Sequence, residues 1–195
     1  ASFLHEAPFN SGSSLNGTFT FSSSVPIAVV ALRGLTNERG EFLITTLPVV
    51  DTNIQTSGIS TIPEFADGGG WTTQVVLVNP SDAIVSGSVR FFTAGSAATG
   101  GQPASLTING QVRSNVAYAI PRRSAIRLQT SGSGATTLVG SIQIVPDSGQ
   151  RAPSGLAIFT SKTGPITVSE AGVPALPAST AVRVYAERSE EHTSE

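Results

Sequence analysis

The chain has 195 residues, of which 39% are apolar and 12% are charged, and its formal net charge at pH 7 is -2. This composition excludes a charged disordered chain, which lacks apolar residues, and a nucleic-acid binder, which needs a basic excess. Cysteine is absent, so disulfides and thiolate metal sites are excluded. No apolar run reaches the roughly 18 residues of a transmembrane helix, so no membrane span is expected.

Short apolar or alternating runs bounded by turn residues predict β-strands along the whole chain, and no stretch shows the 3.6-residue apolar period of a helix. A sheet with one apolar face must bury it on another layer. We therefore expect an all-β fold, a two-sheet antiparallel sandwich of the immunoglobulin-like kind. The expected strands lie at 17–22, 27–33, 41–46, 72–79, 86–93, 105–108, 112–119, 124–129, 138–145, 155–160, 165–170 and 180–186.

An internal repeat sets the expected domain plan. GTFTFSSSVPIAVVALRGLTNERGEFLITTLPVV starts at position 17, and GSIQIVPDSGQRAPSGLAIFTSKTGPITVSEAGVPAL starts at position 140. The simplest interpretation is a tandem module of about 120 to 125 residues, with chance similarity of two β-rich segments as the alternative. Three landmarks recur in the same order, at offsets of 123, 127 and 124 residues: Gly17 with Gly140, Pro26 with Pro153, and Gly40 with Gly164.

On this interpretation the chain is one and a half modules. Residues 1–52 are the C-terminal half of a preceding copy, 53–61 a linker, and 62–187 a complete sandwich. Residues 188–195 (RSEEHTSE) resemble the translation of a sequencing adapter and are expected to be non-native. Half a sandwich leaves open edges and apolar surface, so we expect residues 1–52 either to pack on the complete module or to be the least ordered part.

The stretch ADGGGW combines Asp67, three glycines and Trp71, the chain's single tryptophan. A glycine loop beside an aromatic ring could line a sugar or calcium pocket, with Asp67 as an oxygen ligand. One carboxylate supplies too few ligands for calcium, and the loop matches no phosphate-binding motif. The favoured interpretation is a sharp bend into a strand, with Trp71 capping the core.

Two charged groupings are further candidates. LTNERGEF, residues 35–42, is expected to be a solvated hairpin end, with a binding tip as the alternative and Arg33 paired to Glu38 or Glu41. The main basic grouping comprises Arg122, Arg123 and Arg127, joined by Arg113 and Arg151; it could bind anionic polysaccharide. Aromatic residues do not interleave with these arginines, so no nucleic-acid partner is expected.

Catalysis has few candidate groups. His5 is the one histidine outside the C-terminal tail, and GxSxG and HExxH are absent, so a Ser-His-Asp or zinc hydrolase is not expected. A glycosidase needs two acids across one cleft, and the acids considered are Asp67, Asp82, Asp147 and Glu170. The chain is therefore predicted not to be an enzyme and to need neither metal nor cofactor.

The phrases FADGGGWTTQVVLVNPSD, IAVVALRGLTNERGEFLITTLPVVD and PSGLAIFTSKTGPITVSEAGVPALP resemble a tandemly repeated β-sandwich module of large secreted bacterial proteins. The resemblance covers nearly all of residues 1–187 and transfers no catalytic residue. It implies a secreted or cell-surface location, with any signal peptide outside this sequence, and neighbouring modules of the same polypeptide as partners.

Two functions are weighed from these features. The preferred one is a non-catalytic extracellular module with a structural or adhesive role. The alternative is a carbohydrate-binding module in which Trp71, Tyr118 or Tyr185 stacks on sugar while Asp67 or Arg122 binds hydroxyls. Exposure of the Trp71 ring beside a groove is the feature that separates them.

Overall fold

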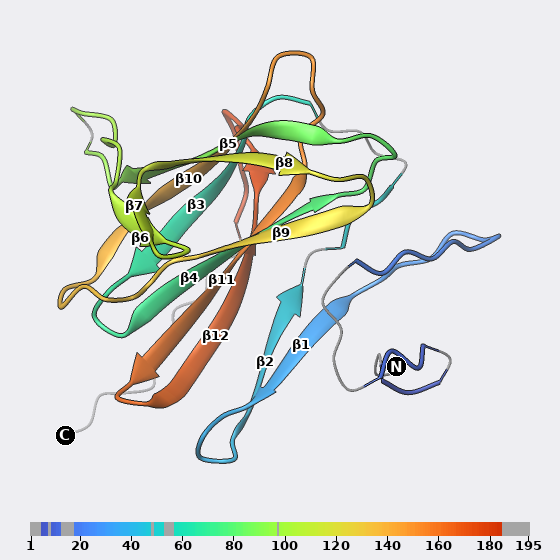
Figure 1. Cartoon of the computed structure of the whole chain (residues 1–195), viewed down its shortest axis with the longest axis horizontal. Helices are drawn as coiled ribbons and strands as arrows, with labels where there is room; N and C mark the ends of the chain where they lie inside the picture. The colour runs from blue at the N-terminus through green and yellow to red at the C-terminus, as the bar shows by residue number, and fades with distance from the viewer. Residues whose placement is uncertain are drawn as a thin grey trace.

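The computed structural model describes residues 5–7, 9–12, 18–47, 49–52, 57–96 and 98–184. This part of the chain contains thirteen strands and no helix (Figure 1). The strands are β1 (Ala31–Thr36), β2 (Phe42–Leu47), β3 (Ser60–Asp67), β4 (Trp71–Asn79), β5 (Val85–Thr93), β6 (Leu106–Ile108), β7 (Gln111–Arg113), β8 (Asn115–Ile120), β9 (Ser124–Gln129), β10 (Leu138–Pro146), β11 (Ser154–Thr163), β12 (Ile166–Pro174) and β13 (Leu176–Pro177).

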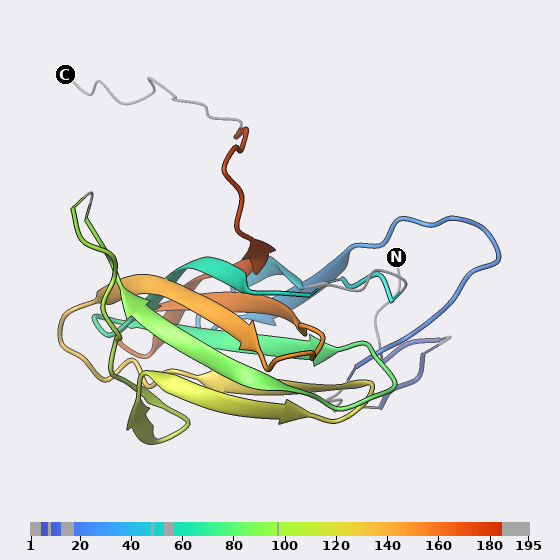
Figure 2. The ribbon, with the colours of Figure 1, turned by 90° about the horizontal axis from the view of Figure 1, so that it is seen from above.

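Two antiparallel sheets make the sandwich. One has the strand order β13-β3-β10-β5-β8, and the other has the order β12-β11-β4-β9. The hairpins β1–β2 and β6–β7 are separate two-stranded sheets. The prediction of an all-β antiparallel sandwich is confirmed. Figure 2 shows that residues 18–30 run out from the sandwich on one side and that the last described residues rise away from it.

One apolar core lies between the sheets. Along β4, β5 and β10 the buried residues alternate with less buried ones, which is the period of two that strands impose. The rings of Phe65 and Phe91 meet edge to face with their centroids 5.7 Å apart. Other core side chains are Ile62, Val75, Leu77, Val89, Val116, Tyr118, Ile120, Ile142, Ile144, Ala157 and Phe159.

A buried threonine joins the two sheets where β3 passes into β4. The Thr73 hydroxyl donates to the Ala66 carbonyl at 2.7 Å and accepts from the Ala66 amide at 3.0 Å. The amide of Thr73 donates to Oγ1 of Thr130 at 2.9 Å. Buried polar groups need such partners, so this network fixes the corner between the sheets.

The sheet edges are closed in different ways. Strand β13 covers only the start of β3, and beyond it the edge of β3 carries Pro63, which has no amide proton, and the exposed Glu64. The β6–β7 hairpin closes on the end of β9 through a bridge between Ile108 and Thr130. The edge formed by β12 meets the β1–β2 hairpin.

Several predicted strands differ from the observed ones. Residues 18–22 and 180–184 form no strand, the first hairpin strand begins at Ala31, and the strand expected at 112–119 is two strands broken at Ser114. Strand β3 starts at Ser60, inside the expected linker, and was not predicted. A strand needs a partner for its backbone groups, and the described residues supply none beside 18–22.

The two segments compared in the repeat share their second half. Both β1–β2 and β11–β12 are antiparallel hairpins, and their turns contain Gly40 with φ 79° and Gly164 with φ 58°. Upstream they differ, because Gly140 lies in β10 whereas residues 18–30 form no strand, and Gly17 lies outside the described residues. The tandem repeat therefore stays a prediction, as do the domain boundaries.

Candidate functional site

The β1–β2 hairpin lies against β12, as Figure 1 shows. Its two strands alternate, so that one face is turned to the sandwich and the other to solvent. Arg33, Leu35 and Thr45 belong to the face that is half-buried or buried. Residues 1–52 were expected to pack on the sandwich or to be poorly ordered, and the hairpin within them packs.

The hairpin turn binds the open backbone of β12. Nδ2 of Asn37 donates to the Thr167 carbonyl at 2.8 Å, and Oε2 of Glu38 accepts from the Thr167 amide at 2.7 Å. Thr167 lies in an edge strand, and these two side chains occupy the backbone groups that a neighbouring strand would otherwise pair. The hydrogen bond from the Thr167 amide holds the pKa of Glu38 below its ordinary value.

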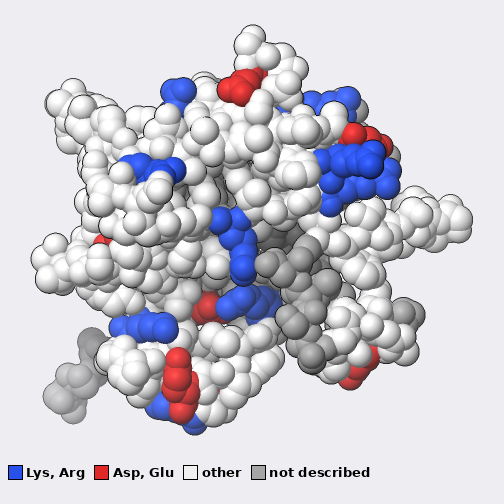
Figure 3. Space-filling model, viewed as in Figure 1, with Lys and Arg blue, Asp and Glu red and all other residues white. Residues whose placement is uncertain are grey.

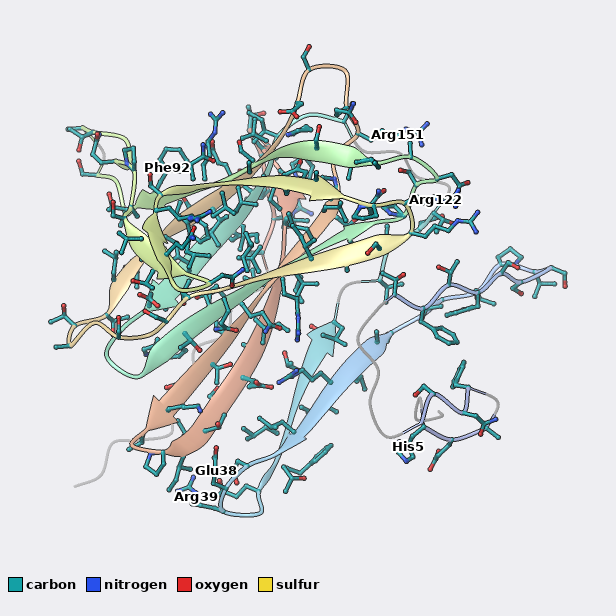
Figure 4. The ribbon with its side chains drawn as sticks, in the orientation of Figure 1. His5, Glu38, Arg39, Phe92, Arg122 and Arg151 are labelled. Atoms are coloured by element: carbon teal, nitrogen blue, oxygen red, sulfur yellow. The ribbon has the colours of Figure 1, made fainter. Side chains whose placement is uncertain are left out.

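The turn is also ordered within itself. Oδ1 of Asn37 accepts from the Arg39 and Glu41 amides at 3.0 Å and 2.9 Å, and Nδ2 of Asn37 donates to Oε2 of Glu41 at 2.7 Å. The Arg39 side chain pairs with the same carboxylate at 2.7 Å on the exposed side (Figure 4). The charged residues Glu38, Arg39 and Glu41 of the expected solvated hairpin end are exposed, whereas Asn37 beside them is buried against β12.

A bidentate ion pair fixes the middle of the hairpin. Nε and Nη2 of Arg33 donate to the two carboxylate oxygens of Glu170 at 3.0 Å and 3.2 Å. The expected pairing of Arg33 with Glu38 or Glu41 is wrong. Arg33 belongs to the face turned to β12, whereas Glu41 pairs with Arg39 and Glu38 binds Thr167.

The backbones approach closely at Gly172 of β12. A Cβ there would meet the Thr46 carbonyl oxygen of β2, so only glycine fits. Gly172 pairs with Ile158 across the ladder, and Ile158 and Leu156 are buried although neither belongs to the core between the sheets. The outer face of this sheet therefore carries its own apolar contact layer.

The glycine loop is a tight bend. The amide and carbonyl groups of Gly68 and Trp71 pair at 2.9 Å and 3.0 Å, and Gly69 and Gly70 between them have φ 60° and 91°, the signs of a type I′ turn. Asp67 is buried and accepts from the Gly132 amide at 2.7 Å. Trp71 is half-buried and packs against the core.

The other two aromatic residues proposed to stack on sugar provide no exposed ring among the described residues. Tyr118 is 4% exposed and lies in the core, and Tyr185 lies outside the described residues. Burial, with a smaller contribution from the nearby Asp147 carboxylate, raises the pKa of Tyr118 to about 12.

Three arginines gather at one end of the sandwich, where Figure 3 shows basic and acidic side chains side by side. Arg122 and Arg123 form the β8–β9 turn, and Figure 4 shows Arg122 and Arg151 at this end of the sandwich. A surface hollow near the turn is lined by Arg123 and Arg151. Nε of Arg123 lies 2.5 Å from Oδ1 of Asp82, an exposed pair that lowers the pKa of Asp82. Arg113 lies in β7 and Arg127 in β9, and neither lines this hollow.

A groove that the sequence did not reveal lies on the outer face of the five-stranded sheet. Phe92 of β5 is half-buried there and pairs across the ladder with Ser141 of β10. Glu64 and Gln143 also line the groove, and among the described residues the side chains of Glu64, Ser141 and Gln143 form no hydrogen bond. An aromatic ring surrounded by unpaired polar groups is the chemistry that carbohydrate sites use.

The acids considered for catalysis are each engaged in a structural contact. Besides the contacts of Asp67, Asp82 and Glu170 given above, Oδ2 of Asp147 accepts from Oγ of Ser86 at 2.6 Å. His5 lies on the N-terminal segment, outside the sandwich (Figure 4). In the part of the chain that the structure covers, no three His, Cys, Asp or Glu side chains are placed to hold a metal ion.

Within the described ranges no helix could cross a membrane.

Comparison with known proteins finds no relative. No family model, no curated protein and no solved structure matches the chain. Ligand binding by Asp67, Trp71, Arg122 and Arg123 therefore stays a prediction, and the hairpin contact with β12 is the site on which a function can be argued.

Proposed function

We propose that the chain is a non-catalytic structural or adhesive repeat module of a larger exported bacterial protein, secreted or held at the cell surface. In this proposal the hairpin of one module docks on β12 of the next. The observation that carries it is the capture of both Thr167 backbone groups by Asn37 and Glu38.

The contact has the features of a specific docking site. It joins a close backbone approach at Gly172 and a bidentate ion pair at Glu170. Charged hydrogen bonds with two donor atoms fix orientation as well as position. A hairpin held in this way spaces two modules in a defined geometry, which is what a structural repeat requires.

The test is the substitution Gly172→Ala. The added methyl group meets the Thr46 carbonyl, while the strand conformation of Gly172 itself tolerates alanine, so the hairpin should undock and the sandwich should stay folded. Hydrogen exchange should then accelerate across 31–47 and remain slow in β4 and β10. Gly100→Ala is the matched control, because a Cβ at Gly100 meets nothing within 4 Å. Unchanged exchange across 31–47 in Gly172→Ala would contradict the docking role.

The outer-face groove favours a second candidate, a carbohydrate-binding module, but with Phe92 as the stacking ring in place of Trp71. The unpaired Glu64, Ser141 and Gln143 supply acceptors and donors for sugar hydroxyls. A glycan array should find a binder whose affinity falls about tenfold or more in Phe92→Ala and is unchanged in Trp71→Phe. An array with no binder counts against this candidate and leaves the docking role untouched.

A further inference from the structure

The N-terminal part of the chain exposes an unusual number of large apolar side chains. They lie on the 18–30 stretch and on the face of the β1–β2 hairpin turned away from β12. Large apolar side chains left exposed together on a folded protein mark an interaction site. The exposed fractions are 47% for Phe19, 54% for Phe21, 74% for Val30, 57% for Leu32, 64% for Phe42 and 56% for Ile44.

The aromatic part of this surface corresponds to core positions of the sandwich. At the offset of 123 residues that relates Gly17 to Gly140, Phe19 and Phe21 fall on Ile142 and Ile144. Both isoleucines are fully buried between the sheets. Apolar residues therefore alternate in the same phase in the two segments. The apolar face is buried in β10 and exposed in residues 18–22.

The hairpin follows the same rule. At the offset of 127 residues that relates Pro26 to Pro153, Leu32 falls on Phe159, a core residue. Arg33, on the opposite face, falls on Thr160, which contacts the Glu170 carboxylate on the outer face of its sheet. The solvent-exposed face of β1 thus corresponds to a core face, and its docked face to an outer face.

We infer that residues 18–47 form one wall of a second sandwich core, whose remaining strands are a copy of residues 60–123. This inference rests on the proposed function, since it names the partner of the module. The choice of 60–123 follows from the complete sandwich. There the other members of the core cluster that holds Ile142, Ile144 and Phe159 lie mostly within that range, in β3, β4, β5, β6 and β8 and at Ala104.

A fusion tests the inference on the intact chain. A copy of residues 60–123 joined directly before Ala1 places Gly17 where Gly140 stands relative to its own sandwich. Because the chain has no cysteine, the single variant Leu32→Cys reports exposure of the hairpin face through its rate of thiol labelling. The variant Val112→Cys is the control, at a position that is 74% exposed and far along the chain from the hairpin.

The expected result is a large, selective protection. Leu32→Cys should label readily in the original chain and about tenfold or more slowly in the fusion, while Val112→Cys should label equally fast in both. Equal labelling of Leu32→Cys in the two chains overturns the inference. So does a fused copy that gains no strand signal in circular dichroism, because the partner would then not fold on residues 18–47.

A second arm separates this inference from the proposed function. In the fusion, Phe19→Asp combined with Leu32→Asp should destabilise the added copy and leave the original sandwich intact. The added copy should then melt at a lower temperature than the original sandwich, so that two separate thermal transitions appear. Unaltered stability of the added copy overturns the inference. Gly172→Ala acts on the opposite face of the hairpin, so a hairpin that stays docked in that variant contradicts the proposed function without changing the labelling of Leu32→Cys in the fusion.

Discussion

The Arg33 guanidinium binds the Glu170 carboxylate with two nitrogens, across 137 residues of sequence. The Glu170 side chain is 4% exposed, whereas that of Arg33 is 41% exposed. A carboxylate so covered depends on its partner, because an unpaired charge away from water is unfavourable. This pair is therefore one of the contacts on which the stability of the docked hairpin depends, beside those at Thr167.

The first prediction concerns this pair. Arg33→Ala leaves the covered carboxylate of Glu170 without its hydrogen-bond donor. The free energy of hairpin opening should fall by about 1–2 kcal/mol, which is less than for a fully buried ion pair because Arg33 is partly solvated. Hydrogen exchange of β1 and β2 measures it. Arg39→Ala, which breaks an exposed pair, should cost much less than Arg33→Ala. In a double-mutant cycle with Glu170→Ala, additive effects would show that the two side chains do not interact.

The second prediction is a loss of docking in acid. The pKa of Glu38 is below its ordinary 4.5 in the docked state, so its contribution is complete above pH 4.5 and is lost as the pH falls through the lowered value. Hairpin amides should therefore exchange faster relative to core amides below that pH. Glu38→Gln, which keeps an acceptor oxygen but cannot titrate, should flatten this dependence. Asp82→Asn is the control, since Asp82 has a lowered pKa far from the hairpin.

The third prediction tests the glycine bend. Gly70→Ala introduces a methyl group at φ 91° and against the Lys162 carbonyl oxygen, so it should destabilise the sandwich by about 2 kcal/mol or more. Gly149→Ala has a similar φ of 75° but open space around it, and should cost about 1 kcal/mol. Urea unfolding compares the two variants. Equal losses would mean that the contact with Lys162 has no energetic role.

The fourth prediction concerns Tyr118, whose buried hydroxyl has no hydrogen-bond partner among the described residues. Tyr118→Phe removes that hydroxyl and should leave stability at pH 7 unchanged or raise it by up to about 1 kcal/mol. The folded-state pKa of about 12 lies above the ordinary 10, so the wild type should lose stability as the pH rises from 10 to 12. The phenylalanine ring of the variant cannot ionise, so its loss of stability over that range should be smaller. A marked destabilisation of the variant at pH 7 would reveal an unseen partner of the hydroxyl.

Local patterns predicted local structure well. The glycine bend and most strands of the sandwich follow from alternation and turn residues, which act over a few positions. Strand β3 was missed because Pro63 and Glu64 interrupt its alternation, and neither disrupts the ladder at a sheet edge. Residues 18–22, the described part of the strand expected at 17–22, form no strand. Strand pairing depends on a neighbouring strand that the local sequence does not specify.

The contacts of the site could not be read from the sequence for the same reason. Glu170 and Thr167 are more than a hundred residues from Arg33 and Glu38, and only the fold brings them together. The nearest acids in sequence were therefore the wrong partners for Arg33. The outer-face groove at Phe92 was missed because its lining comes from four different strands and a loop.

Pro63 and Glu64 have a consequence for molecules that meet at high concentration. An uncovered strand edge recruits strands from other molecules, and near-identical sequences are the ones that join most readily into continuous aggregates. Pro63 has no amide proton and the neighbouring Glu64 carries a charge, so the exposed edge of β3 pairs poorly with a strand from another molecule. Crowded copies of this protein are thereby kept from stacking edge to edge through that strand.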